Sequence, residues 1–261
     1  FFRAHSAAGA CCAMRSALHP LRPWAAGRRM YGTHSAVVVG GGFAGIACAS
    51  ALTQRGWSVA LVEAGRGLGG RVATRRTEDG LSFDHGAQYL KIPAGHALWD
   101  AASGLLQPWS RSLGTARITP DGFNFQPYPE SKLDALRVAA PTMSSLGRSL
   151  CDGCGPALSV FTGSRATAIH HDEAGWTTSV QQREAQGQAE LALSSKVLVT
   201  ATSAPSASKL MQCLSAGDTD TDRSLLTAAA DIQQKAEAIQ STVCWALLAA
   251  FQDPLPLPFD A

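Results

Sequence analysis

Three glycines at a fixed spacing are the residues of this sequence best suited to binding chemistry. They lie in the run Gly40-Gly41-Gly42-Phe43-Ala44-Gly45, which follows three valines and has the pattern G-x-G-x-x-G. Gly40 would allow a tight turn, Gly42 would let the main chain approach a pyrophosphate with no Cβ in the way, and Gly45 would allow close packing of a helix on a strand. The amide groups of a helix starting at Phe43, with Ala44 in its first turn, would face the phosphates. The run therefore predicts a site for the diphosphate of a dinucleotide.

A carboxylate follows where such a site needs one. Residues 58–63 read as a short buried strand that ends in Glu63, and Ala64 comes next. The Glu63 carboxylate would accept hydrogen bonds from a ribose diol, and it would repel a 2′-phosphate, which disfavours NADP. These residues together do not distinguish NAD from FAD.

The elements that must position these residues form a βαβ unit. Residues 36–39 predict a strand and residues 43–56 a helix, and the strand at 58–63 should lie parallel and adjacent to the first with a right-handed crossover. Further along, the pattern predicts a helix at 143–151, a β-meander that returns to a buried strand, and then a helix and an apolar strand. The ranges of these last elements are 159–169, 176–182, 189–193 and 196–200 for the meander and returning strand, 222–240 for the helix and 242–251 for the strand.

A second glycine-rich segment makes the signal more specific. It contains Gly69-Gly70-Arg71 within the pattern E-x-x-R-x-x-G-G-R, and the sequences A-T-R-R and F-D-H-G-A-Q-Y follow it. These motifs together resemble the amine-oxidase-like flavoproteins, and in particular the renalase-like branch of that superfamily. The resemblance implies that Gly69 and Gly70 bring the main chain against the diphosphate of FAD and that Arg71 neutralises it, as a guanidinium fork can. It also implies cofactor contacts at Gly86, Ala87 and Gln88, and at Ala166 beside the adenine.

The resemblance carries an expectation for the fold. It implies an α/β protein with a Rossmann-like FAD-binding domain, an inserted β-meander and a second, smaller α+β substrate domain that is incomplete at its C-terminal end. We expect residues 35–94 and 143–207 to form the FAD-binding domain, and residues 95–142 and 208–261 to form the truncated substrate domain. Members of the family continue to a Gly-Asp segment that faces the flavin, and this sequence has no such segment.

The resemblance also implies an activity. It suggests an oxidase-type, FAD-dependent oxidoreductase that takes electrons from a small reduced nicotinamide- or amine-like donor and passes them to oxygen. Two alternatives remain open, a non-catalytic or truncated dinucleotide-binding protein and an NAD-dependent dehydrogenase. Asp84 and His85 could lie near the flavin, but no residue is assigned a catalytic role.

The first 34 residues differ in composition from the rest. No Asp or Glu precedes Glu63, although the formal net charge of the whole chain is only +2. An arginine- and alanine-rich segment without acids is typical of a transit peptide, so we exclude residues 1–34 from the fold and expect a chloroplast or mitochondrial protein, with a cytoplasmic one as the alternative. Basic and aromatic residues do not interleave as in nucleic-acid-binding proteins, and no run approaches the roughly 18 apolar residues of a membrane helix.

Two other clusters could suggest metal or redox chemistry. Cys151 and Cys154 have the C-x-x-C spacing, but a second pair is missing and the pair lies in a glycine-rich turn. His170 and His171 precede two acidic residues, but consecutive residues of a hairpin point apart. We therefore expect an incidental cysteine pair, a solvated turn and no metal site.

Overall fold

The computed structural model describes residues 29–92, 102, 104–109, 114–129, 136–184, 187–215 and 222–253. Most of the segment that we interpret as transit-like, residues 1–28, lies outside the described residues.

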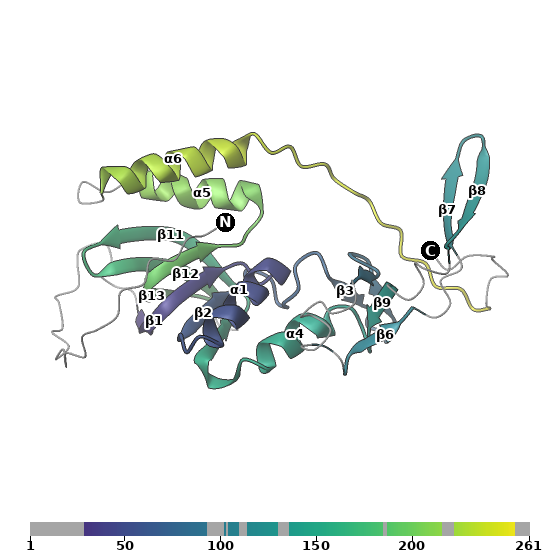
Figure 1. Cartoon of the computed structure of the whole chain (residues 1–261), viewed down its shortest axis with the longest axis horizontal. Coiled ribbons are helices and arrows are strands. Elements are labelled where there is room, and N and C mark those ends of the chain that lie inside the picture. The colour runs from purple at the N-terminus through teal and green to yellow at the C-terminus, as the bar shows by residue number, and fades with distance from the viewer. Residues whose placement is uncertain are drawn as a thin grey trace.

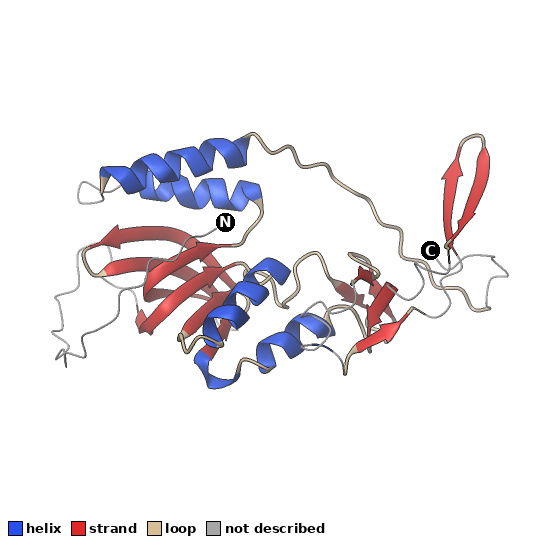
Figure 2. Cartoon of the chain, in the orientation of Figure 1, coloured by secondary structure: helices blue, strands red, loops and turns tan. Residues whose placement is uncertain are grey.

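A six-stranded sheet is the largest sheet of the described structure and lies on the left in Figure 2. Its strand order is β10-β2-β1-β13-β12-β11. The first four strands in this order are parallel, and β12 and β11 continue the sheet as an antiparallel meander. The bounds are β1 Arg29–Val39, β2 Val59–Val62, β10 Leu158–Phe161, β11 Ser164–Asp172, β12 Gly175–Glu184 and β13 Gly187–Thr200. The mixed α/β architecture with a parallel-rich sheet is the predicted fold class.

The βαβ unit has the predicted form. β1 and β2 are adjacent and parallel, with Ala36 opposite Val59, and α1 (Phe43–Thr53) connects them. Residues 36–39 of β1 and all of β2 are buried, because helices cover both faces of this part of the sheet. Side chains alternate along β1, so that Val37 and Val39 pack on one face and Val38 packs against Ile46 of α1 on the other.

Three strand boundaries differ from the sequence prediction. β1 begins at Arg29, inside the segment that we exclude from the fold, because β13 is long enough to pair with it as far as Leu191. The strands predicted at 189–193 and 196–200 are one continuous strand, β13. The strand predicted at 159–169 is divided at Gly163, whose φ of 61° turns the chain from β10 into β11.

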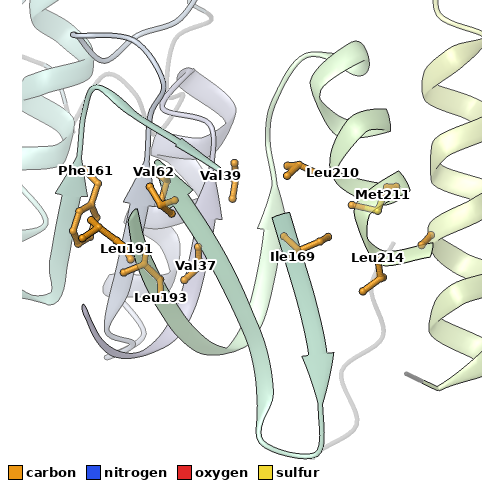
Figure 3. Close-up of a cluster of buried hydrophobic side chains, with 13 residues drawn as sticks. Val37, Val39, Val62, Phe161, Ile169, Leu191, Leu193, Leu210, Met211 and Leu214 are labelled. Carbon is orange, nitrogen blue, oxygen red and sulfur yellow. The ribbon is translucent and has the colours of Figure 1, made fainter. Parts of the chain in front are cut away.

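A helical pair covers the face of the sheet that Val37 and Val39 share (Figure 1). It consists of α5 (Ala204–Ser215) and α6 (Arg223–Glu237). Leu210, Met211 and Leu214 of α5 join the sheet residues in one buried cluster (Figure 3). This part of the 208–261 segment therefore packs with the large sheet, whereas we expected it in the smaller substrate domain. The apolar residues of α5 pack on the sheet, and Ala229 of α6 belongs to the same buried cluster.

The remaining elements are small. The helices are α4 (Ser145–Asp152) and the 3-10 turn η2 (Gly155–Ala157), and the strands are β3 Thr74–Arg76, β4 Ser82–Asp84, β5 Leu90–Lys91, β6 Leu106–Pro108, β7 Gly114–Thr119, β8 Gly122–Pro127 and β9 Leu136–Ala139. β5, β9 and β6 form a three-stranded sheet, and β3–β4 and β7–β8 are hairpins. A second buried cluster that includes Val72, Met143 and Leu146 ties the three-stranded sheet to α4.

The strand predicted at 242–251 is not formed. These residues have no strand or helix assignment and run as an extended, exposed segment beyond α6 (Figure 1). Trp245 and Leu247 are 92% and 93% exposed. An apolar pattern makes a strand only beside a partner strand, and the described residues supply none here.

Candidate dinucleotide-binding site

The glycine run forms a tight corner between β1 and α1. Gly40 has a φ of 112°, and a Cβ on it would lie 2.5 Å from the carbonyl oxygen of Ala201. A Cβ on Gly45 would overlap the carbonyl oxygen of Gly40. Both glycines are therefore required by the packing of the strand, the helix and the chain after β13.

Gly42 is different, because its surroundings leave room for a side chain. The nearest atom to a Cβ built on Gly42 is the Cα of Gly70, at 4.0 Å, and its φ of −74° suits any residue. Gly42 is also the N-cap of α1 and makes no side-chain capping bond. The space beside Gly42 is what a phosphate group approaching the N-terminus of α1 would occupy.

The second glycine segment lies directly against this corner. The amide of Gly69 donates to the carbonyl oxygen of Gly41 at 2.8 Å, and Gly42 and Gly69 form an isolated parallel bridge. Gly69 and Gly70 both have positive φ, and a Cβ on Gly70 would lie 3.1 Å from the Cα of Gly42. The structure thus brings Gly42, Gly69 and Gly70 together, as an FAD diphosphate site would require.

Arg71 adds a positive charge next to this surface. Its side chain is exposed, and its guanidinium makes no hydrogen bond or ion pair with any residue that the structure describes. Its carbonyl oxygen accepts a hydrogen bond of 2.9 Å from the amide of Ala87, and a Cβ on Gly86 would overlap the same oxygen. Gly86 and Ala87 therefore lie beside the main chain of Arg71.

Glu63 is held by main-chain amides. Its Oε2 accepts from the amide of Gly41 at 2.7 Å, and its Oε1 accepts from the amide of Gly65 at 2.5 Å. Each carboxylate oxygen has about two acceptor sites, so that one on each oxygen stays open to a ribose hydroxyl. Gly41 and Gly65 hold the Glu63 carboxylate, and we did not select either of them from the sequence. The middle glycine of the Gly40–Gly42 run is the sequence signal for Gly41.

The other predicted site residues differ in their exposure and packing. Phe43 and Ala87 pack against one buried cluster, whereas Ala44, Ala64 and Gln88 are exposed. Ala166 lies in β11 and packs against the cluster beneath α5. The link from its strand to the site is at Ser164, whose amide donates to the carbonyl oxygen of Glu63 at 2.8 Å.

One oxygen of the Asp84 carboxylate makes hydrogen bonds within the protein. Its Oδ1 accepts hydrogen bonds from Thr74 Oγ1 at 2.5 Å and from the amide of Met143 at 3.1 Å. Thr74 Oγ1 in turn accepts from the amide of Ser144 at 3.1 Å. This network fastens the β3–β4 hairpin to the start of α4.

A cleft of about 1190 Å³ lies between the 65–70 loop, the β3–β4 hairpin and α4. Glu63 and Gly70 are the predicted site residues among those that line it. His85 lines it too, while Arg76 and Arg148 are lining residues that sequence reasoning missed. Arg76 belongs to the A-T-R-R motif, whereas no motif marks Arg148, and only the packing of α4 against the hairpin brings both residues to one cleft.

Cys151 is buried and Cys154 is half-buried, and both are free cysteines. Burial, followed by the neighbouring Cys154 and Asp152, raises the pKa of the Cys151 thiol to about 11. Cys154 Sγ donates to the carbonyl oxygen of Leu150. In the described part of the chain, no three His, Cys, Asp or Glu residues are grouped so that they could hold a metal ion. None of the helices described is both long and apolar enough to cross a membrane.

Comparison with known proteins supports the fold. The family model of the NAD(P)-binding Rossmann-like domain matches residues 38–105. The 4,4'-diaponeurosporene oxygenase of Staphylococcus aureus (strain USA300) is 41% identical over 61 residues, which are 23% of this chain and 12% of that protein. The chain thus spans about an eighth of the length of this curated relative.

Solved structures with higher coverage show the same architecture. A putrescine oxidase bound to putrescine superimposes with a TM-score of 0.54 at 14% identity, over 77% of this chain and 64% of that one. A double mutant of putrescine oxidase, from a redesign of cofactor binding, gives the same TM-score over 76% of this chain and 63% of that one. The glycine corner, the 65–71 loop and these likenesses lead to one conclusion: this chain contains a Rossmann-like dinucleotide-binding domain and shares the fold of putrescine oxidase.

Proposed function

We propose that this chain is the cofactor-binding part of an FAD-dependent oxidoreductase of the oxidase type. The observation that carries the proposal is the open space at Gly42, at the N-terminus of α1 and beside Gly70. Arg71 follows Gly70 in the chain, and its guanidinium has no partner among the residues that the structure describes. Amides at a helix N-terminus and an arginine fork together suit a doubly charged diphosphate.

The second loop supports FAD rather than NAD. A nicotinamide cofactor could use the first glycine run and Glu63, but it would leave the Gly69-Gly70-Arg71 loop, bonded to Gly41, without a role. The matches to oxygenase and oxidase chains point the same way. We place the chain in the renalase-like branch on its motifs alone.

The residues of this chain would bind and orient the cofactor. The first amides of α1 and Arg71 would hold the diphosphate, and the open acceptor sites of Glu63 would receive the ribose hydroxyls. The Gly86–Ala87 segment, fixed on Arg71 by a main-chain hydrogen bond, would border the cofactor beyond the diphosphate. FAD, when bound, would supply the redox chemistry, as it would accept a hydride from a small reduced nicotinamide- or amine-like donor and pass the electrons on to oxygen.

The absorption spectrum of the purified chain tests this proposal. We expect a band near ~450 nm that bleaches when a reductant is added and returns in air, with peroxide as the product. A chain that binds nucleotides but shows no flavin band contradicts the proposal and favours a non-catalytic binding protein. Reduction of NAD by a substrate, without flavin, favours the dehydrogenase.

A further inference from the structure

Gly147 of α4 is a buried glycine that no motif of the sequence explains. It lies within the helix, where glycine is less favourable than alanine because its backbone loses more freedom on folding. A Cβ built on Gly147 would lie 3.3 Å from both the Cα and the amide nitrogen of Gly69, and 3.2 Å from Cδ1 of Ile46. The close packing of the Gly69 main chain on α4 therefore accounts for a glycine at position 147.

Gly69 links α4 to the glycine corner. Its amide donates to the carbonyl oxygen of Gly41 at 2.8 Å, while its Cα faces Gly147 of the helix. Gly70 comes next in the chain, and a Cβ on Gly70 would lie only 3.1 Å from the Cα of Gly42. A shift of Gly69 away from α4 would therefore alter its hydrogen bond with Gly41 and the spacing between Gly70 and Gly42.

The packing of α4 makes the loop, rather than the helix, the part that must move. Leu146 and Met143 are 0% exposed in one buried cluster, and Cys151 is buried in another. The amide of Met143 also donates to Asp84 Oδ1 at 3.1 Å. Gly69, in contrast, belongs to a loop outside the helices and strands. We therefore expect a side chain at position 147 to displace the 65–71 loop.

We propose that Gly147 is a positioning residue for the cofactor site. Because it has no side chain, α4 can support the 65–71 loop at the place where the loop borders the space at Gly42. Gly147 acts through Gly69 and is not itself a ligand of the cofactor. The inference rests on the proposed function, since it assigns to α4 a role in FAD binding.

Gly147→Ala tests the proposal, with Gly153→Ala as the matched control. Gly153 is the C-cap of the same helix, and a Cβ there would meet nothing closer than 3.6 Å. Titration of each apoprotein with FAD measures the dissociation constant. We expect Gly147→Ala to raise it about tenfold, which is the effect of one overpacked contact, and Gly153→Ala to leave it unchanged. Circular dichroism checks that both variants are folded.

Hydrogen exchange of the apoproteins, followed by mass spectrometry, reports on the loop without the cofactor. In Gly147→Ala we expect faster exchange of the peptide that spans residues 66–72, because the amide of Gly69 loses part of its hydrogen bond to Gly41. Exchange in α5, at residues 204–215, should not change. Ile46→Val removes the Cδ1 atom nearest to the added methyl group, so the double variant should recover part of both losses.

Three outcomes would overturn the proposal. The first is equal FAD affinity of Gly147→Ala and the wild-type protein, and the second is faster exchange throughout the chain instead of in the loop. The third is a double variant that recovers neither FAD affinity nor protection of the loop. If the wild-type chain takes up no FAD, the proposed function fails, and the exchange of the 66–72 peptide still decides whether Gly147 positions the loop.

Discussion

At the scale of single residues, the three glycines of the G-x-G-x-x-G run have two different roles. Gly40 and Gly45 are fixed by atoms of the protein itself, namely the carbonyl oxygens of Ala201 and Gly40. A Cβ built on Gly42 would meet nothing closer than 4.0 Å. The packing of this corner does not require a glycine at position 42. We therefore explain Gly42 by a ligand that approaches the main chain from outside.

Gly42→Val should abolish FAD binding in a folded protein. The valine side chain would fill the space reserved for the diphosphate, while its backbone φ and the nearest contact are compatible with valine. The flavin absorbance per chain after purification measures the loss. Undiminished FAD in this variant would show that the phosphate site is placed wrongly.

Gly45→Ala is the contrasting control for that variant. Its methyl group would overlap the Gly40 carbonyl oxygen, so the helix must shift away from β1. We expect the free energy of unfolding in urea to fall by about 1–3 kcal/mol. We therefore expect Gly42→Val, but not Gly45→Ala, to lose FAD without this loss of stability.

Cys151 should react slowly with alkylating reagents. Its pKa is raised to about 11, mainly by burial, so that at pH 8 nearly all of the thiol is protonated and only the thiolate reacts. The exposed Cys244 provides the comparison within the same chain. Mass spectrometry after iodoacetamide treatment of the native protein at pH 8 should find Cys244 modified first, and prompt modification of Cys151 would contradict its assignment as a structural cysteine.

At the scale of the elements, packing decides which helix belongs to which part of the fold. α5 has a helical stripe of apolar residues that fits the sheet face of Val37 and Val39, and α6 adds Ala229 to the same cluster. The segment after α6 is just as apolar but remains exposed, because the described chain offers it no strand edge to pair with. Apolar composition alone therefore does not predict burial.

Leu214→Ala should destabilise the protein strongly, whereas Leu247→Ala should not. Leu214 is 1% exposed in the cluster between α5 and the sheet, and Leu247 is 93% exposed. We expect losses of about 2–5 kcal/mol for the first variant and changes within about 0.5 kcal/mol for the second. Urea denaturation followed by circular dichroism measures both; equal losses would mean that the 242–251 segment is buried after all.

The N-terminus of α6 should lose its cap at low pH. Asp222 Oδ1 accepts a hydrogen bond of 2.8 Å from the amide of Ser224, and this bond lowers the pKa of the carboxyl. A lowered pKa means that the stabilisation is present above the unfolded pKa and is lost as the pH falls through the lower, folded value. Asp222→Ala should lower the stability at neutral pH and remove this pH dependence.

Asp222→Asn separates the two contributions of that residue. The asparagine keeps a capping oxygen without the charge, so the stability at neutral pH should be largely retained. The melting temperature measured between neutral and acid pH distinguishes the variants. An unchanged pH profile in Asp222→Ala would show that the cap does not contribute.

At the scale of the whole molecule, the proposed cofactor would join parts that are distant in the sequence. The corner at Gly40–Gly45, the loop at 65–71 and the Gly86–Ala87 segment meet at one edge of the sheet, and a dinucleotide lying across them would contact all three. A ligand that binds the folded state in this way stabilises it by mass action.

FAD should raise the melting temperature more than NAD does. At a free concentration one hundred times its Kd, a ligand adds about 2.7 kcal/mol to the free energy of unfolding. Thermal unfolding of the apoprotein with and without each dinucleotide measures the difference, and Gly42→Val should abolish the shift. A shift with NAD and none with FAD would favour the dehydrogenase alternative.

The sequence alone determined the local structure around the phosphate corner. The run from Val37 to Gly45 and the strand that ends at Glu63 predict their own geometry, because a turn with positive φ, a helix start and a buried strand are specified by adjacent residues. The same locality explains why the motif at Gly69-Gly70-Arg71 could be recognised. Its contact with Gly41 and Gly42 then follows from the shared edge of the sheet.

The tertiary structure alone decided the rest. The start of β1 at Arg29, the packing of α5 and α6 on the sheet, and the exposure of residues 242–251 depend on which strand or face is available as a partner. Arg76 and Arg148 line the same cleft because a hairpin and a helix are joined through Asp84 and Thr74. Such contacts link residues far apart in the chain, and no local pattern encodes them.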